Sequence, residues 1–303
     1  MITAANSLKE RSLLGLKDLS RHEIESILDR AMYWESQSEK RTPVLESKFV
    51  ANMFFENSTR TRFSFEMAQK RLGAQVLNFA AAASSVAKGE SIYDTVRTIE
   101  SMGIDAGVIR LKPAGVLQHL AEHVQVPLIN AGDGNNEHPT QALLDLFTMR
   151  KAFGELKGLS VSIVGDIVQS RVARSNLWAL QKFGADVRFC APASMQAPEL
   201  AEHAPYVTME EALQADVVMM LRVQLERHAE GVLKSPEQYR EQYGLTEERA
   251  AKLNKNTIIM HPAPVNRNVE IDDAVVESPQ SRIFPQMVNG VPIRMAVMER
   301  AMK

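Results

Sequence analysis

The chain has 303 residues, of which 45% are hydrophobic and 24% charged, and its formal net charge is -2. This composition is typical of a globular protein of about two domains, and the balanced charge excludes a global basic field that would hold nucleic acid. The sequence has no signal-peptide core and no apolar run of the roughly 20 residues that span a membrane, so we expect a soluble cytoplasmic protein.

The first half of the chain alternates strand-like runs with helical runs, which predicts an α/β fold with parallel sheets. A helix begins at Ser20, which forms a capping box with Glu23. A second helix ends at Gly73, and a third extends from Pro139 to Gly154. The strands predicted between these helices cover residues 50–55, 74–79, 106–110 and 127–130.

The second half repeats this alternation and predicts a second sheet. A helix over residues 171–183 ends at Gly184. The predicted strands cover residues 159–164, 186–190, 217–221 and 257–260. We therefore expect two domains, residues 1–152 and 153–290, each a parallel β-sheet flanked by helices, with a C-terminal helix over about 291–303 that packs back on the first domain.

The only cysteine, Cys190, lies in one of these strand-like runs. A lone cysteine excludes an intrachain disulfide and fits a reducing compartment. Its apolar neighbours indicate a small buried side chain rather than a nucleophile.

Unusual polar clusters follow the C-terminal ends of the predicted strands. They are residues 56–62, Arg110, residues 166–171, Arg222 and residues 261–264. In open α/β sheets, ligands bind outside these ends of the strands. The pattern therefore predicts a binding site before any family is considered.

Residues 58–62, with the sequence STRTR, stand at a strand-to-helix turn. The first N–H groups of a helix are unpaired and the dipole is positive there, so anions bind readily. Hydroxyl and guanidinium groups would add charge-assisted hydrogen bonds worth about 1.5–3 kcal/mol each. The alternative is a serine N-cap before a solvated turn, but the five-residue cluster favours phosphate binding.

Three segments resemble motifs of the aspartate and ornithine carbamoyltransferases. Residues 54–62 (FFENSTRTR) resemble the phosphate-binding signature, and residues 132–134 (GDG) with 138–146 (HPTQALLDL) resemble the second motif. Residues 260–267 (MHPAPVNR) resemble the aspartate branch. The ornithine branch typically has Cys after the His of the last two motifs, where this chain has Pro139 and Pro262. The resemblance extends over essentially the whole chain.

The resemblance implies an enzyme that transfers the carbamoyl group of carbamoyl phosphate to L-aspartate in de novo pyrimidine biosynthesis. Residues 1–152 would bind carbamoyl phosphate and residues 153–290 aspartate, with the active site between the domains and at the subunit interface of a homotrimer. No cofactor, metal, nucleic acid or membrane is expected. Regulatory chains or other pyrimidine-pathway chains are further candidate partners.

The resemblance also assigns the carbamoyl phosphate site. The phosphate would be bound by Ser58, Thr59, Arg60, Thr61 and Arg110. The carbamoyl oxygen would be surrounded by Thr61, Arg110 and His138. The carbamoyl NH2 would be held by Gln141 and by the backbone carbonyls of Ala263 and Pro264. Each donor to the oxyanion of the tetrahedral intermediate contributes on the order of 3 kcal/mol. We expect His138 to donate a hydrogen bond rather than act as the general base, because the phosphate leaving group can take the proton.

Residues 83–91 resemble the loop that, in this family, reaches into the active site of the neighbouring subunit. Ser84 and Lys88 match the family's serine and lysine, although Ser85 is an alternative for the serine. Lys88 would act in catalysis and in aspartate binding, together with Arg60, Thr61, Arg110 and His138 as the catalytic set. A site shared in this way requires an oligomer.

Arginines suit the two carboxylates of aspartate because each guanidinium can bind one of them in bidentate fashion. Arg171, Arg222 and Gln224 match the family's aspartate-binding residues. Glu56 and Arg227 match residues whose interdomain ion pairs accompany domain closure, and we expect them to be structural.

The sequence also bears on three alternative functions. The first is a carbamoyltransferase with another acceptor amine, such as ornithine, and only the second-domain residues distinguish these enzymes. A dinucleotide enzyme is disfavoured because the turn at Gly165 lacks the G-x-G-x-x-G spacing. A non-catalytic paralogue would be expected to have lost Arg60, Arg110, His138 or Lys88, and all four are present.

Overall fold

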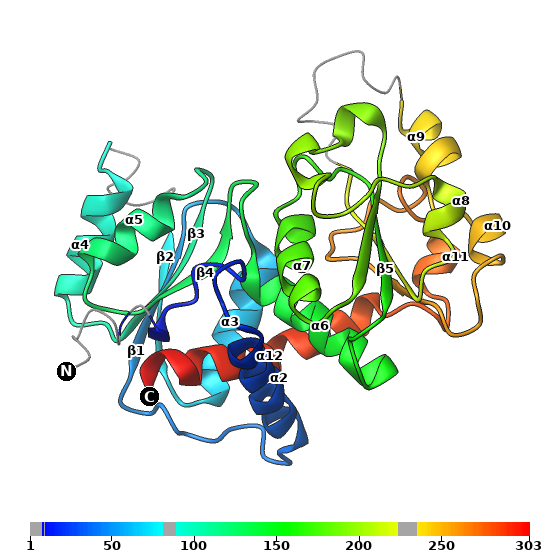
Figure 1. Ribbon diagram of the computed structural model, residues 1–303. Helices are drawn as coiled ribbons and strands as arrows, with labels where there is room; N and C mark the ends of the chain where they lie inside the picture. Colours follow the sequence, from blue (N-terminus) through cyan, green and yellow to red (C-terminus); the bar gives the residue numbers. More distant parts are fainter. Residues whose placement is uncertain (1–7, 9, 81–88, 224–234) are drawn as a thin grey trace. The chain divides into compact units, whose positions relative to one another are not determined.

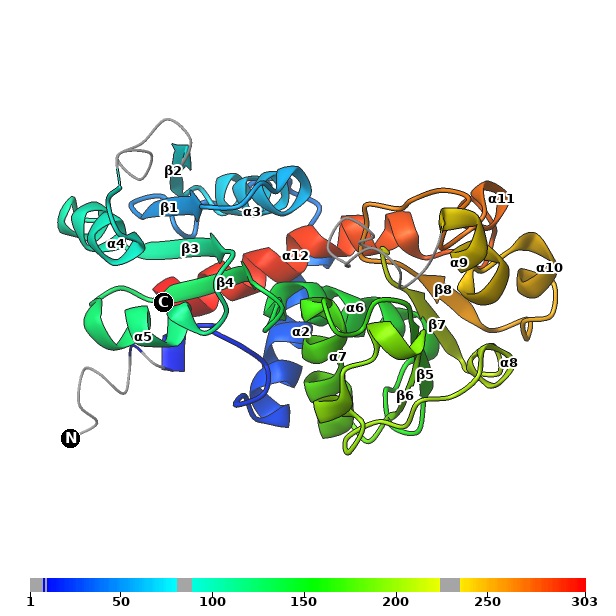
Figure 2. The same ribbon diagram turned by 90° about the horizontal axis from the view of Figure 1, so that it is seen from above.

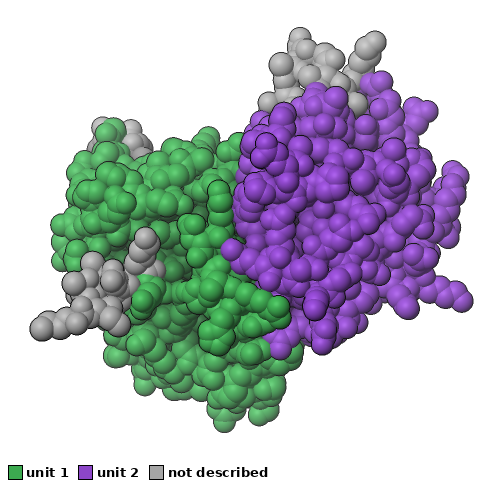
Figure 3. Space-filling model, in the orientation of Figure 1, with its two compact units in different colours: residues 1–144, 289–303 green, residues 145–288 purple. Residues whose placement is uncertain are grey.

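The computed structural model describes residues 8, 10–80, 89–223 and 235–303. The chain divides into two compact units, coloured separately in Figure 3. Unit 1 contains Met1–Leu144 and Asn289–Lys303, and unit 2 contains Asp145–Val288. No helix in the described part of the chain is both long enough and apolar enough to cross a membrane.

Unit 1 is built on a parallel sheet with the strand order β2-β1-β3-β4. The strands are β1 (Phe49–Phe54), β2 (Gln75–Ala80), β3 (Ala106–Leu111) and β4 (Leu128–Asp133). The helices are α2 (Arg21–Ser36), α3 (Thr59–Arg71), α4 (Ile92–Ser101), α5 (Val116–His123) and the first part of α6 (Pro139–Phe153). The last part of α12 (Ile283–Met302) completes the unit.

Helices α3, α4 and α5 lie beside the sheet of unit 1 (Figures 1 and 2). Side chains that alternate along β1 contact different helices. Met53 packs in the apolar core formed with α4 and α5. Asn52 points to the opposite face, as expected from the two-residue period of a strand, and exchanges two hydrogen bonds of 2.9 and 2.8 Å with Gln69 of α3. This pairing satisfies both buried amides and fixes α3 against β1.

Unit 2 repeats the plan with the strand order β6-β5-β7-β8, again parallel. The strands are β5 (Ser160–Val164), β6 (Asp186–Cys190), β7 (Val217–Met220) and β8 (Ile258–Met260). The further helices are α7 (Arg171–Lys182), α8 (Met209–Ala212), α9 (Pro236–Tyr243), α10 (Glu247–Ala250) and α11 (Asp273–Val276), with two short 3-10 turns at Ala193–Met195 and Pro198–Leu200. The predicted fold of two parallel sheets flanked by helices is confirmed.

Cys190 is the last residue of β6 and is almost completely buried in the core of unit 2. Burial, with a smaller effect from Glu210, raises the pKa of the thiol to about 12. The interpretation of Cys190 as a core side chain is confirmed, because a buried thiol with this pKa is not ionised near neutral pH.

Candidate active site

The carboxyl edge of the unit 1 sheet brings three of the predicted segments together. Arg110 lies opposite Phe54 in the register of β3 and β1, and its carbonyl accepts a hydrogen bond of 2.9 Å from the N–H of Phe55. Asp133, at the end of β4, lies opposite Leu111. The turn before α3, the end of β3 and the loop after β4 therefore meet at one edge, where ligands bind in such sheets.

Ser58 is the N-cap residue of α3, but its side chain makes no capping hydrogen bond. Thr59 and Arg60 are exposed in the first turn of the helix, and Thr61 is buried. The first turn contains no acidic residue that would compete for the N–H groups. The Ser58 hydroxyl and the positive end of the helix are thus not used for capping and suit an anion.

Arg110 is oriented by two contacts within unit 1. Its Nε lies 3.1 Å from Oε2 of Glu56, and its NH1 donates to the carbonyl of Ala131 at 3.2 Å. Both charged side chains are mostly buried, at 12% and 13% exposed, so the pair restricts the guanidinium more than a surface ion pair would. Glu56 therefore has a role toward Arg110 that the sequence did not indicate. Its predicted partner Arg227 lies outside the described residues.

The loop between β4 and α6 is held by the carboxylate of Asp133. Oδ1 accepts hydrogen bonds from the Asn130 side chain at 2.8 Å and from the N–H of Glu137 at 3.1 Å, and Oδ2 accepts from the N–H of Gly115 at 3.0 Å. Gly134 has a φ of 51°, and a Cβ there would stand 2.6 Å from a backbone carbonyl, so only glycine fits.

Glu137 anchors the same loop to the N-terminal segment. Its two carboxylate oxygens accept hydrogen bonds from the backbone N–H groups of Leu16, at 2.8 Å, and Lys17, at 3.2 Å. The sequence showed no sign of this contact because its partners are 121 and 120 residues apart. The contact fixes the residue that directly precedes His138.

His138 and Gln141, at the start of α6, are both nearly buried. The carbonyl of His138 accepts the N–H of Gln141 at 3.0 Å, which begins the helix. His138 thus stands at the start of the helix. This position is compatible with a role in the site, because the helix contact uses the backbone carbonyl and not the imidazole.

Arg294 is a buried cation of α12 that sequence reasoning missed. Its NH1 donates to Oγ of Ser64 in α3 at 2.8 Å, and its NH2 lies 3.5 Å from Oγ1 of Thr140 in α6. It therefore connects the two helices whose first turns carry the predicted phosphate and carbonyl donors. A single arginine in an otherwise apolar helical segment is the signal that could have identified it.

The carboxyl edge of the unit 2 sheet carries the predicted acceptor residues. Arg171 is the first residue of α7, where Ser170 caps the helix by accepting from the N–H of Ala173 at 3.0 Å. Arg222 follows β7 and is half-buried. Ala263, after β8, has a φ of 52° and precedes Pro264 through a cis peptide bond.

Four residues that the sequence assigns to substrate binding lie outside the described part of the chain. They are Ser84, its alternative Ser85, Lys88 and Gln224. Their roles stay predictions from the resemblance.

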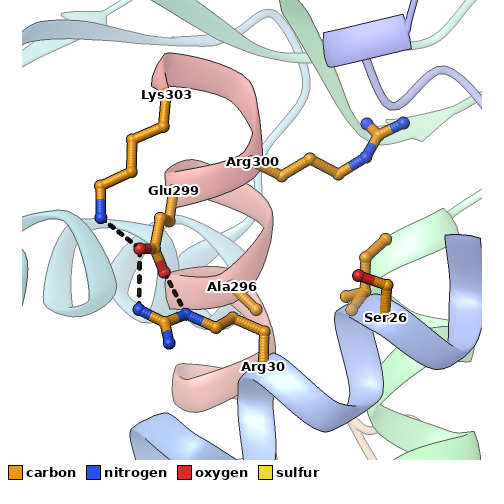
Figure 4. Close-up of a pocket in the computed structure, with 7 residues that line it drawn as sticks. Ser26, Arg30, Ala296, Glu299, Arg300 and Lys303 are labelled. Carbon is orange, nitrogen blue, oxygen red and sulfur yellow. Dashed lines mark hydrogen bonds and ion pairs between the residues drawn. The ribbon is translucent and has the colours of Figure 1, made fainter.

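A pocket of about 300 Å³ lies between α2 and α12 of unit 1 and contains none of the predicted site residues (Figure 4). Arg30 and Lys303 point toward the carboxylate of Glu299, at 2.6 and 2.5 Å. Trp34 donates a further hydrogen bond to Glu299 at 2.9 Å. Because these charges satisfy one another, the pocket is a structural junction between two helices rather than a site for the predicted chemistry.

One group of possible metal ligands occurs among the described residues. Atoms of His119, Glu122 and His123 lie within 4.8 Å of one another, and all three side chains are exposed. They belong to the end of α5, which leads to the amino end of β4, whereas the predicted site residues gather at the carboxyl edge. The group therefore has no part in the candidate site.

Family models match almost the whole chain. The model described as "Aspartate/ornithine carbamoyltransferase, carbamoyl-P binding domain" matches residues 11–151. The model described as "Aspartate/ornithine carbamoyltransferase, Asp/Orn binding domain" matches residues 157–301. Both halves of the chain thus agree with one family in the same order.

Solved structures of both branches are similar over nearly their full length. Aspartate transcarbamoylase from Trypanosoma cruzi, in complex with carbamoyl phosphate and aspartate, is 29% identical, with 100% of both chains covered and a TM-score of 0.86. The catalytic subunit of M. jannaschii aspartate transcarbamoylase is 36% identical, with 96% of this chain and 97% of that chain covered and a TM-score of 0.84. Ornithine carbamoyltransferase from Pyrococcus furiosus is 29% identical, with 97% of both chains covered and a TM-score of 0.86. The chain belongs to the aspartate/ornithine carbamoyltransferase family.

Proposed function

We propose that the chain transfers the carbamoyl group of carbamoyl phosphate to the amino group of L-aspartate, in de novo pyrimidine biosynthesis. Membership of the family supports carbamoyl transfer in general. Aspartate as the acceptor is supported by Arg171 and Arg222, which follow β5 and β7 at the same edge of the unit 2 sheet. Two guanidinium groups suit a dicarboxylate, whereas ornithine has a single carboxylate and would leave one guanidinium unpaired.

Carbamoyl phosphate would be bound mainly by residues of unit 1. The STRTR turn and Arg110 would neutralise the phosphate, and Arg110 is already oriented by Glu56. Thr61, Arg110 and His138 would stabilise the oxyanion that forms when the amine attacks the carbamoyl carbon. Gln141 and the carbonyls of Ala263 and Pro264 would hold the NH2 group.

The chemical step balances without a cofactor. The amine nitrogen of aspartate forms a bond to the carbamoyl carbon, and the bond from that carbon to the phosphate oxygen breaks. The products are N-carbamoyl-L-aspartate and phosphate, and the amine proton leaves with the phosphate. Loss of one oxyanion donor typically lowers kcat by about 100-fold, which is the effect we expect for His138→Ala at saturating substrates.

We further propose that the enzyme is a cytoplasmic homotrimer in which Ser84 and Lys88 act in the site of a neighbouring copy. If another copy completes each site, we expect an isolated chain to be inactive. Regulatory chains remain candidate partners of this assembly.

An acceptor assay tests the proposed function directly. Purified protein is mixed with carbamoyl phosphate and either L-aspartate or L-ornithine, and both carbamoylated products and phosphate are measured. We expect product with aspartate only. Product with ornithine only would overturn the acceptor assignment, and product with neither would overturn the assignment as an active transferase.

A further inference from the structure

A buried set of hydrogen bonds in unit 2 supports the turn that carries Ala263 and Pro264. His261, the first residue after β8, has no exposed surface, and its Nδ1 accepts the N–H of Ala263 at 2.8 Å. Because a backbone N–H can only donate, Nδ1 must be unprotonated, and the proton of the neutral ring lies on Nε2. Nε2 lies 3.2 Å from Oε1 of Glu270, to which it donates.

The turn needs this support because of its backbone conformation. Ala263 has a φ of 52°, in the left-handed region that disfavours residues with a Cβ. Such a conformation persists where the surroundings determine it. The bond from the N–H of Ala263 to His261 is a contact that determines it here.

Glu270 holds a second segment through Asn266. The Oε1 of this fully buried carboxylate also accepts the N–H of Asn266 at 2.6 Å. The Asn266 side chain donates to the carbonyl of Val223 at 3.1 Å. One carboxylate thus connects the Ala263 turn to the segment of Arg222 and Val223 after β7.

The backbone of His261 is fixed from the other side by three more buried polar side chains. Its N–H donates to Gln286 of α12 at 2.9 Å, and Gln286 donates to Oδ1 of Asp145 in α6 at 2.8 Å. Asn176 of α7 donates to Oδ2 of Asp145 at 2.8 Å. Both oxygens of the buried Asp145 carboxylate are therefore paired, and this chain of contacts holds the backbone of His261 in one geometry.

We infer that His261, Glu270 and Asn266 are positioning residues for the binding of carbamoyl phosphate and aspartate. This inference rests on the proposed function. Through His261, Glu270 sets the carbonyls of Ala263 and Pro264, which accept hydrogen bonds from the carbamoyl NH2. Through Asn266, it sets the segment that carries Arg222. None of the three touches substrate.

Acetyl phosphate separates positioning from general stability, because it has a methyl group in place of the carbamoyl NH2. His261→Gln keeps a donor toward Glu270 but loses the acceptor for the N–H of Ala263, whereas His261→Asn keeps that acceptor and loses the donor. We expect His261→Gln to bind carbamoyl phosphate about tenfold more weakly, with acetyl phosphate within about twofold of wild type. His261→Asn should stay within about threefold for carbamoyl phosphate.

Calorimetric titration of both ligands gives these affinities, and thermal unfolding confirms that each variant is folded. His203→Gln, an exposed histidine of the same unit, is the matched control and should change neither affinity. Equal weakening of both ligands in His261→Gln would show a general structural effect and overturn the inference, as would no weakening of either. Wild-type protein that carbamoylates neither amine would refute the proposed function instead.

Asn266→Ala tests the second contact even if the buried His261 variants fail to fold, because Asn266 is only half-buried. We expect the KM for L-aspartate to rise about fivefold, with the affinity for carbamoyl phosphate unchanged. An unchanged KM for aspartate in a folded, active variant would contradict the role of the Asn266 side chain in positioning the segment that carries Arg222.

Discussion

At the scale of single residues, Ser20 and Ser58 show how one residue type serves two purposes. Both occupy N-cap positions in an extended conformation. Ser20 accepts the N–H of Glu23 at 3.2 Å in a complete capping box, whereas Ser58 makes no side-chain capping bond. The hydroxyl of Ser20 therefore caps its helix, whereas the hydroxyl of Ser58 makes no hydrogen bond to an N–H group of its helix.

Alanine at each position should therefore affect different properties. Ser20→Ala should lower the free energy of unfolding by about 1 kcal/mol and leave ligand binding unchanged. Ser58→Ala should leave stability within about 0.5 kcal/mol and weaken carbamoyl phosphate binding about tenfold or more, because a charge-assisted hydrogen bond is lost. Urea unfolding and calorimetric titration measure the two effects. The reverse pattern, with Ser58→Ala unstable and binding normally, would make Ser58 an ordinary cap.

At the scale of secondary-structure elements, α12 differs most from its prediction. The sequence predicted a helix from about residue 291, but the helix begins at Ile283 and contains Pro292 in its interior. A proline removes the hydrogen bond to the carbonyl four residues earlier. That residue is Val288, which is 67% exposed, so water can satisfy its carbonyl. Tertiary context thus overrides a local signal that normally marks a helix start.

The contact between α2 and α12 predicts a pH-dependent stability. Burial alone would raise the pKa of Glu299, but hydrogen bonds from Arg30, Lys303 and Trp34 lower it below its usual range. A lowered pKa means that the carboxylate stabilises the fold at neutral pH and that this contribution is lost as the pH falls through the folded-state pKa. Glu299→Gln should lower the free energy of unfolding by about 2 kcal/mol at pH 7, and the difference from wild type should shrink below about pH 4.5.

Urea unfolding at pH 7 and at pH 4 checks this expectation. Glu248→Gln is the matched control, because Glu248 pairs with Lys252 at 3.0 Å on an exposed helix surface. Such a pair contributes little, so the control should leave the free energy of unfolding essentially unchanged at both pH values. An equal loss in Glu299→Gln at both pH values would show that packing, rather than the charge of Glu299, stabilises this contact.

At the scale of the whole molecule, the proposed trimer predicts complementation between inactive variants. Lys88→Ala and His138→Ala subunits should each form nearly inactive trimers. If Lys88 serves the site of a neighbouring copy, mixed trimers contain some sites in which both residues are native. Dissociating the two variants, mixing them and reassociating them should therefore restore a measurable part of the wild-type activity.

The recovered activity is compared with that of each variant carried through the same treatment alone. Sedimentation gives the size of the reassembled particles. Trimers that form without any recovery would contradict a shared site, and active monomers would contradict the proposed assembly.

The sequence by itself determined the eight strands of the described residues, the helices α2, α3, α6 and α7, and the family. Strand runs, the Ser20 capping box and the glycines that end α3, α6 and α7 are local signals, because they depend on hydrogen bonds within a few residues. The clusters at residues 58–62, 138–141 and 261–264 could be recognised because each is contiguous in the sequence. Parallel strands then bring these clusters to the carboxyl edges of the sheets.

Only the tertiary structure decided which polar groups hold the site residues in place. Glu56 contacts Arg110, Glu137 holds the chain near Leu16, and Arg294 reaches Ser64, over separations of up to 230 residues. Such partners leave no periodic pattern in the sequence, because a hydrogen bond between distant segments depends on strand register and helix packing. The chemistry at the sheet edges is therefore encoded locally, whereas the geometry that supports it is a property of the folded units.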